Sequence, residues 1–294
     1  MKTAFAFALL GLIWGSTWLA ADTLAAQAPP LRASAVRFLL AALVLLPVIL
    51  LKRWQMPRGR ALGYLLLLSI TLIALPLVLL LWARQQLPSA TVAVLFALMP
   101  LVVILLTPGL EGRLVPNRAT PAAIVGLGAI ALATGASFSA AQAGGAAVVF
   151  VAVASTGASS LIARRELKGM NPLVVMAFLL GPAALLLFAA SMVLERGLSF
   201  PWNRDAIVAV ALLAILGGAV PYALYFWLLQ KLEAYQLATL QWIQPLVAVG
   251  ETAVVLRRGY SYSMLAGSLV TLGSVLVVMR ARVEDDDTVS LLGN

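Results

Sequence analysis

The chain is a succession of long apolar runs, each separated from the next by a short polar break. A helix needs about 20 mostly apolar residues to cross the ~30 Å hydrocarbon core of a bilayer. Runs of this kind lie at 4–24, 34–51, 61–82, 89–109, 119–138, 145–163, 172–194, 206–229, 236–256 and 263–280. The sequence therefore predicts an all-α polytopic membrane protein with ten transmembrane helices.

The composition excludes the soluble classes of protein. Hydrophobic residues make up 63% of the chain and charged residues 11%, against about 45–50% and about 25% in ordinary globular domains. The chain has no cysteine and no histidine, which excludes disulfides, histidine-ligated metals and a serine–histidine–aspartate triad. It also has no glycine-rich phosphate loop with lysine, so ATP is not expected to drive it directly. We predict no enzyme activity, no cofactor and no metal site.

The basic residues lie in the short breaks between the apolar runs. This placement is typical of the cytoplasmic loops of membrane proteins and differs from the clustered basic face of a nucleic-acid-binding domain. With a cytoplasmic N-terminus, 13 of the 20 Lys and Arg residues fall on the cytoplasmic side. We therefore predict that both termini are cytoplasmic and that the chain binds no nucleic acid, despite its net charge of +9.

The two ends of the chain need separate interpretation. Lys2, the apolar stretch after it and small residues near the end of that stretch resemble a cleavable signal peptide. The stretch is nevertheless about 20 residues long and contains Trp14 and Trp18, which favours a first transmembrane helix. At the other end, residues 282–294 begin with an acidic run and are predicted to form a disordered cytoplasmic tail.

The two halves of the chain match each other at an offset of 145 residues without a gap. Pro76 aligns with Pro221 and Trp82 with Trp227, and 11 of the 29 positions from 74 to 102 are identical. Shared Leu and Ala mean little in an apolar chain, so the aligned prolines and tryptophan carry most of the weight. The register predicts an internal duplication.

Each half of the duplication holds five predicted helices. Because five is odd, the second half starts on the opposite side of the membrane, and the two repeats are inverted. We place the repeats at 1–143 and 144–281. Inverted repeats are typical of secondary transporters, whose substrate site lies near the midplane between the halves. A repeat that serves only as a scaffold is the alternative.

Prolines interrupt the predicted helices at corresponding positions of the two halves. They are Pro76 and Pro100 in the first half and Pro221 and Pro245 in the second. Proline removes a backbone hydrogen bond and bends a helix, which membranes tolerate where a neighbour or a water-filled cavity satisfies the freed groups. We predict kinks or gating points beside a transport path, with simple packing kinks as the equal alternative.

Several sequence elements together resemble a known family. They are GLIWGST at residues 11–17, AVRF at 35–38, PLV at 100–102, EGRL at 111–114 and a glycine-rich fifth apolar run. The chain resembles the drug/metabolite transporter superfamily, in its ten-helix branch with two EamA-type repeats. Within it, the chain is similar to bacterial exporters of amino acids, including aromatic ones. The resemblance implies a multi-pass protein of the bacterial inner membrane with a small-molecule substrate and the lipid bilayer as partners.

The chain departs from the family pattern at two charged positions. The family often has Lys a few residues after Trp-Gly-Ser, where this chain has Asp22. The second repeat commonly ends its fourth helix with a Gly-Glu pair, whereas Arg257 and Arg258 occupy that place here. These departures put in doubt a proton-coupling role that is inferred from the charges of the family.

The predicted ninth helix carries the most informative polar residues. Gln241, Gln244 and Glu251 lie on one stripe at helical spacing. Polar side chains inside spanning helices are costly and usually face a bundle interior or a cavity. An ionised carboxylate at that depth needs a partner or becomes neutral. Glu251 therefore contacts a substrate ammonium, carries a proton, or pairs with a nearby basic residue for structural reasons.

The predicted eighth helix carries a group of aromatic residues that includes Tyr222, Tyr225 and Trp227. Aromatic side chains can mark the bilayer interface, or their faces can hold apolar and cationic groups of a substrate. On the second interpretation, Trp82 and Trp227 form a pair related by the repeat.

Other residues of the first, second and sixth runs are expected to serve packing. Gly11 and Gly15 form a face of small residues that lets another helix approach closely. Arg37 is predicted to snorkel or to pair structurally, with Asp22 as a candidate partner. Four hydroxyl residues are expected to bond their own helix or a neighbour more often than a ligand; they are Ser155, Thr156, Ser159 and Ser160.

We predict a secondary transporter that exports small amphipathic metabolites, above all aromatic or apolar amino acids, by alternating access around a midplane cavity. The predicted substrate-binding residues are Trp82, Tyr222, Tyr225, Trp227, Gln241, Gln244 and Glu251. The alternatives are a multidrug or nucleotide-sugar transporter of the same fold, or a non-transporting membrane subunit or lipid enzyme. A nucleotide-sugar transporter would need a cationic cavity, which few buried basic residues here support. The coupling ion, the direction of transport and the oligomeric state stay open, a monomer being one option.

Overall fold

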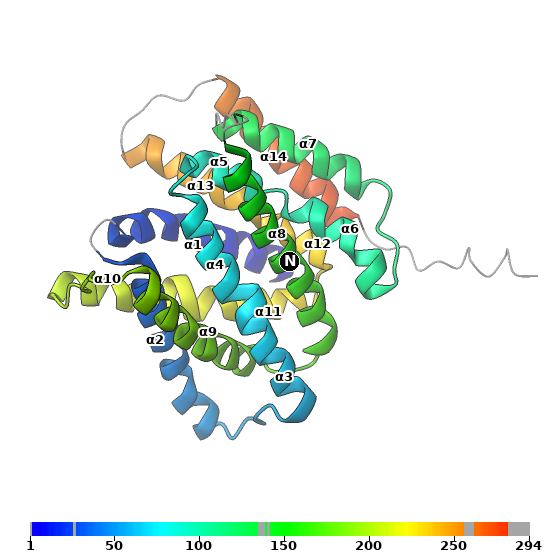
Figure 1. Cartoon of the computed structure of the whole chain (residues 1–294). Helices are drawn as coiled ribbons and strands as arrows, with labels where there is room; N and C mark the ends of the chain where they lie inside the picture. Colours follow the sequence, from blue (N-terminus) through cyan, green and yellow to red (C-terminus); the bar gives the residue numbers. More distant parts are fainter. Residues whose placement is uncertain (1, 26–27, 135–138, 140–141, 256–261, 282–294) are drawn as a thin grey trace, which may run out of the picture.

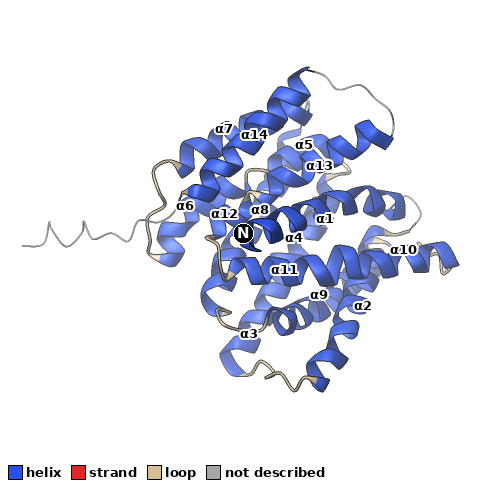
Figure 2. Ribbon diagram, turned by 180° about the vertical axis from the view of Figure 1, so that it is seen from behind, coloured by secondary structure: helices blue, strands red, loops and turns tan. Residues whose placement is uncertain are grey.

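The computed structural model describes residues 2–25, 28–134, 139, 142–255 and 262–281. This part of the chain is helical and contains no strand (Figures 1 and 2). The predicted all-α class is therefore confirmed for the described residues. The tail predicted at 282–294 lies outside them, as do Arg257 and Arg258.

Some of the predicted runs form a single helix. These are α1 (Lys2–Ala25), α2 (Pro30–Leu51), α7 (Ala119–Thr134), α8 (Ala143–Glu166), α9 (Pro172–Leu194) and α14 (Tyr262–Arg280). The others are divided into shorter elements. They are α3 (Gly59–Leu68), η1 (Ser69–Ala74) and α4 (Leu75–Ala83); α5 (Ser89–Phe96) and α6 (Met99–Glu111); α10 (Arg204–Ala214), η3 (Ile215–Ala219) and α11 (Val220–Leu229); and α12 (Ala234–Ala238) and α13 (Leu240–Val255).

Six helices of the described residues are long and apolar enough to cross a membrane. They cover Pro30–Leu51, Gly59–Ala83, Thr91–Glu111, Ala143–Glu166, Pro172–Leu194 and Ala206–Leu229. Two shorter apolar helices cover Ala119–Ala133 and Met264–Arg280. The chain thus has the helices of a multi-pass membrane protein, and the total of ten spans stays a prediction.

The divided runs show how the chain accommodates its prolines. A π-helical turn, η1, directly precedes the turn of α4 that contains Pro76, and η3 precedes the turn of α11 that contains Pro221. A second helix satisfies polar groups of the first break: Ser155 of α8 donates to the carbonyl of Thr71 at 2.6 Å. Such satisfaction by a neighbour is what irregular backbone needs at membrane depth.

The other two prolines behave differently from each other. Pro100 follows a break at Ala97 and Leu98 that separates α5 from α6. Pro245 lies inside the continuous helix α13. Pro100 and Pro245 therefore share a position in the sequence register without sharing a local backbone conformation.

Helices from the first and second halves of the chain pack on one another. The most extensive contacts join α2 to α9 and α7 to α14, and both pairs lie side by side in the two views (Figures 1 and 2). Contacts between α1 and α13 depend on Gly11 and Gly15, where an added methyl group would clash with Ile243 and Val247. The predicted packing role of these glycines is confirmed.

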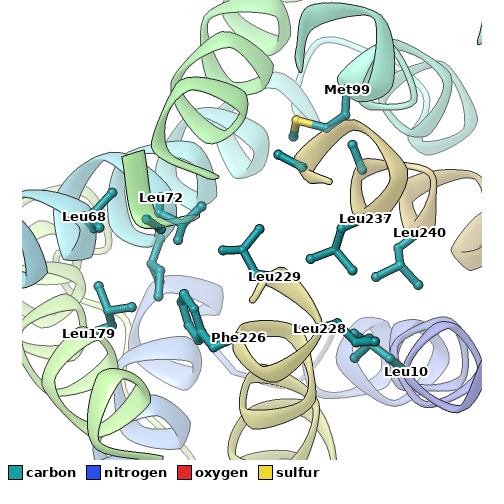
Figure 3. Close-up of a cluster of buried hydrophobic side chains, with 14 of the residues drawn as sticks. Leu10, Leu68, Leu72, Met99, Leu179, Phe226, Leu228, Leu229, Leu237 and Leu240 are labelled. Carbon is teal, nitrogen blue, oxygen red and sulfur yellow. The ribbon is translucent and has the colours of Figure 1, made fainter. Parts of the chain in front are cut away.

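The buried core runs continuously between the two halves. Figure 3 shows part of it, with Leu68 and Leu72 on one side and Leu237 and Leu240 on the other. Phe226 and Leu229 of α11 lie between them. Because lipid tails are as apolar as leucine, close packing of these side chains, and not escape from water, stabilises the contact between helices.

Candidate functional site

A cavity of about 310 Å³ lies between helices from both halves of the chain. Its wall includes residues of α1, α2, η1, α4, α5, α8, α10, η3, α11 and α13. The predicted residues that line it are Pro76, Tyr222, Tyr225, Gln241, Gln244 and Pro245. The structure thus brings together residues from distant parts of the sequence at one site.

Aromatic rings form one side of the cavity. The ring of Tyr222 lies edge-on to Trp14 at 5.5 Å between centroids and edge-on to Phe38 at 6.0 Å. Tyr225 lies 5.7 Å from Trp14. These spacings are typical of favourable aromatic contacts. The rings therefore stabilise one another and present a preformed apolar surface to the cavity.

Polar groups complete the wall next to these rings. The hydroxyl of Tyr225 lies 2.8 Å from the hydroxyl of Ser160. Gln244 donates from Nε2 to Oε1 of Gln241 at 3.1 Å. Thr156 also lines the cavity, and its hydroxyl donates to its own helix at Ala152. Few and fixed polar groups on a mostly apolar wall are what small-molecule sites generally offer.

Two arginines, Arg37 of α2 and Arg84 after α4, line the cavity as well. The guanidinium of Arg37 lies over the ring of Phe38, at 4.6 Å from its centroid. This position differs from the predicted snorkelling, and the predicted structural pairing stays a prediction. The side chain of Asp22, the partner considered for it, lies outside the described part of the structure.

Both tryptophans predicted to bind substrate lie away from the cavity wall. Trp82 is 43% exposed on the outside of the helix bundle. The ring of Trp227 contacts Lys231, whose Nζ lies 4.8 Å from the ring centroid. Helix geometry explains both positions, since each residue advances about 100°. Trp227 points about 200° away from Tyr225, and Trp82 points about 200° away from Arg84.

Three other predicted residues do not contribute to the described wall. Pro100 and Pro221 are buried outside it. Glu251 lies in α13, but its side chain is outside the described part of the structure, so its predicted role is untested.

Sequence reasoning missed several lining residues. Trp14 and Thr17 of α1 face the cavity, although neither was predicted to bind substrate. On α4 and just beyond it, the lining residues are Leu77, Leu80, Leu81 and Arg84. Their spacing of three, one and three residues marks one helix face. That periodicity, together with the charged residue at its end, would have predicted that this face of the helix lines a cavity.

The model of the EamA-like transporter family matches this chain twice, at residues 1–135 and 143–280. The chain belongs to the EamA-like transporter family. The two matched segments, called the first and second EamA segments below, each supply helices to the cavity wall.

Similar proteins agree with this membership. Protein PagO of Salmonella typhimurium is 27% identical over 253 residues, covering 83% of this chain and 81% of PagO. YedA of Escherichia coli K12, named an uncharacterized inner membrane transporter, is 26% identical over 278 residues, with 91% and 90% covered. A solved crystal structure superposes with a TM-score of 0.79 at 19% identity, covering 94% of this chain and 96% of the other. The last comparison shows a shared fold.

An ionic network joins the two EamA segments away from the cavity. Arg164, at the end of α8, contacts Glu111 at 3.0 Å and Glu233 at 2.8 Å. Arg113 contacts the same two carboxylates, at 2.7 Å and 2.8 Å. Glu111 and Arg113 belong to the first EamA segment, and Arg164 and Glu233 to the second. We call these four residues the inter-segment network.

The inter-segment network is tightly hydrogen-bonded. Arg164 also donates from Nε to the carbonyl of Leu232 at 3.0 Å, so all three of its nitrogens have partners. A hydrogen bond to the Glu111 carboxylate raises the pKa of the Arg113 guanidinium above its ordinary value. The side chain of Glu111 is only 6% exposed. Paired charges at this depth hold the ends of α6, α8 and α12 together.

Proposed function

We propose that this EamA-like transporter is a secondary transporter of the bacterial inner membrane that exports small amphipathic metabolites. The proposed substrate class is the amino acids with aromatic or apolar side chains. The cavity between the two EamA segments carries the proposal, because it combines aromatic rings in edge-on contact with a few polar groups.

The chemistry of the wall fits the two ends of such a substrate. The faces of Trp14, Tyr222 and Tyr225 offer an apolar surface for a side chain and a quadrupole that attracts an ammonium group. Gln241 and Gln244 offer amide donors and acceptors on the same lining. At about 310 Å³, the cavity is at the lower end of the size of small-molecule sites, about 300–1,000 Å³.

We further propose that the chain spans the membrane ten times in two inverted five-helix repeats. Packing between elements at corresponding places of the register supports this arrangement: α2 contacts α9, and α7 contacts α14. The contact of α1 with α13 also has a counterpart in that of α6 with α8. The π-helical turns η1 and η3 occur at corresponding positions as well.

Transport would proceed by alternating access around the cavity. The lining includes Leu24, Pro30 and Arg84, which lie at the predicted outer ends of their helices. The inter-segment network lies at the predicted cytoplasmic ends and contributes no residue to that lining. We infer that the conformation is open toward the outside, with the network as the closed cytoplasmic gate and both termini on the cytoplasmic side.

A transporter of larger anionic substrates, such as nucleotide sugars, is the second candidate. Arg37 and Arg84 favour it, because they give the wall more positive charge than the sequence predicted. The size of the cavity favours a single amino acid over a nucleotide sugar. A multidrug transporter and a non-transporting subunit are further outcomes that a flux assay separates.

The test is flux in proteoliposomes that contain only the purified protein. Preloaded phenylalanine, tryptophan, leucine and a nucleotide sugar are compared, with and without a pH gradient. We expect saturable amino-acid flux, strongly reduced by Tyr225→Ala and Gln244→Ala in protein that remains folded. Tyr262→Ala is the matched control, because Tyr262 is 93% exposed.

Three outcomes would contradict the proposal. Flux of the nucleotide sugar alone would favour the second candidate. Flux of none of the three amino acids would remove the proposed substrate class. Amino-acid flux that is unchanged in both cavity variants would place the transport path elsewhere.

A further inference from the structure

Arg37 is the residue of the described cavity wall that has a buried side-chain nitrogen without a hydrogen-bond partner. Its Nε is buried and makes no hydrogen bond. No ion pair joins Arg37 to a described carboxylate, and the described lining contains no Asp or Glu. Arg84, the other lining cation, has an interaction within the protein.

The charge of Arg37 lies inside a membrane-spanning helix, where its free-energy cost must be offset by an interaction. Arg37 is seven residues beyond Pro30 in α2, about 10 Å along the helix axis at 1.5 Å per residue. Charged side chains at such positions are costly, and they usually pair with another group or serve a transported substrate. The contact with Phe38 orients the guanidinium, but it leaves the buried Nε–H without an acceptor.

We propose that Arg37 binds the carboxylate of the transported substrate. The free Nε fits the side-on mode, in which Nε–H and a neighbouring Nη–H donate in parallel to both oxygens of one carboxylate. Arg37 lies next to Tyr222 and Phe38 on the wall, so the substrate's apolar part would rest on the aromatic rings. This inference rests on the proposed function and adds the anionic group that the substrate must carry.

The site separates two parts of substrate recognition. The rings of Trp14, Tyr222 and Tyr225 recognise an apolar or aromatic group, whatever charge the molecule has. Arg37 distinguishes a carboxylate from a neutral isostere. Lysine at this position would keep the charge and lose the planar pair of donors.

The experiment is isothermal titration calorimetry on the purified full chain in detergent, with two probes. 3-Phenylpropionate carries the carboxylate, and 3-phenylpropanamide is its neutral isostere. We expect the wild-type protein to bind the carboxylate at least about tenfold more tightly, the effect of losing hydrogen bonds to a charged group. Arg37→Gln should bring the ratio of affinities to about one and leave the affinity for the amide within about twofold.

Two further variants control the measurement. Arg37→Lys should give an intermediate ratio, because a point charge replaces the fork of donors. Arg196→Gln, at an exposed arginine beyond the end of α9, should keep the wild-type ratio. Retained binding of the amide by Arg37→Gln shows that the cavity is intact.

Equal affinities in the wild-type protein, no binding of either probe, or an unchanged ratio in Arg37→Gln would overturn the inference. If Arg37→Gln loses affinity for both probes, Arg37→Lys decides: a reduced ratio supports the inference and an unchanged one overturns it. Phenylalanine flux without carboxylate preference would leave the proposed function standing and remove this inference. Carboxylate preference without amino-acid flux would leave this inference standing and contradict the proposed function.

Discussion

The indole of Trp242 donates from Nε1 to the carbonyl of Ala97 at 2.8 Å, and the two residues are 145 positions apart. This separation equals the offset at which the two halves of the sequence match. Under a two-fold pseudosymmetry, corresponding residues touch each other only near the axis. The hydrogen bond therefore marks the place where the axis of the proposed inverted repeats would pass, and Trp242 is fully buried there.

The buried ring of Trp242 leaves no room for a side chain at Gly126. A methyl group at Gly126 would lie 2.6 Å from the ring, whereas one at Gly128 of the same helix would meet nothing within 4 Å. We expect Gly126→Ala to destabilise the protein by about 1–3 kcal/mol, the usual effect of overpacking. Gly128→Ala should leave the stability unchanged or slightly higher. Thermal unfolding in detergent tests this pair, and equal melting temperatures would refute the predicted clash.

The hydroxyl of Tyr225 should contribute less to transport than its ring does. Tyr225→Phe removes the contact with Ser160 but keeps the aromatic face toward Trp14. A single hydrogen bond is worth about 0.5–1.5 kcal/mol, so we expect KM for phenylalanine to rise about two- to tenfold. Tyr225→Leu should raise KM further. The concentration dependence of counterflow measures both variants, and equal effects would mean that the ring makes no separate contribution.

The inter-segment network should control access from the cytoplasmic side. Because the chain has no cysteine, Thr156→Cys places a single thiol on the cavity wall. Adding Arg164→Gln removes one of the two cations that Glu111 and Glu233 share, and Arg113 is the other. We expect labelling by an impermeant maleimide in inside-out vesicles to become about tenfold faster. This corresponds to a loss of about 1.4 kcal/mol from the free energy that favours the closed cytoplasmic side.

Arg165→Gln is the control for this network, because Arg165 lies at the same helix end, with its side chain 55% exposed. It should leave the labelling rate of Thr156→Cys close to that of the parent variant. An unchanged rate in Arg164→Gln as well would mean that the network is not a gate.

The buried carboxylate of Glu195 caps a helix from another part of the chain. It accepts from the backbone N–H groups of Leu31 at 2.7 Å and Arg32 at 3.0 Å, in the first turn of α2. Glu195→Gln removes the negative charge that interacts favourably with the N-terminus of α2. It also places the N–H donors of the glutamine amide beside the backbone N–H donors of that helix. We expect a loss of about 1–3 kcal/mol, measured as a lower melting temperature in detergent. An unchanged melting temperature would show that solvent replaces the cap.

Much of the fold was predictable because lipid leaves few alternatives. Apolar runs of spanning length must be helices or barrel strands, and the runs at 34–51 and 172–194 lie within or coincide with α2 and α9. The π-helical turns before Pro76 and Pro221 were not predictable. Proline indicates that a hydrogen bond is lost, but the neighbouring helix decides how the backbone adjusts.

The site was predictable only in part, for two different reasons. Tyr222 and Tyr225 share one helix face, whereas Trp227 does not, and counting about 100° per residue would have separated them. Arg37 is a different case. Whether a membrane arginine snorkels, pairs or faces a cavity depends on the helices around it, which a pattern along one helix does not show.

The central claim is that substrate passes through the cavity between the two EamA segments, and protection of a cavity thiol tests it most directly. Thr156→Cys proteoliposomes are treated with a maleimide in the presence and absence of phenylalanine, and both labelling and phenylalanine flux are measured. Ser199→Cys, at an exposed position outside the cavity wall, is the control. We predict that labelling of Thr156→Cys blocks flux and that phenylalanine slows this labelling but not that of Ser199→Cys. Full flux after complete labelling of Thr156→Cys, with no protection by phenylalanine, would contradict the claim.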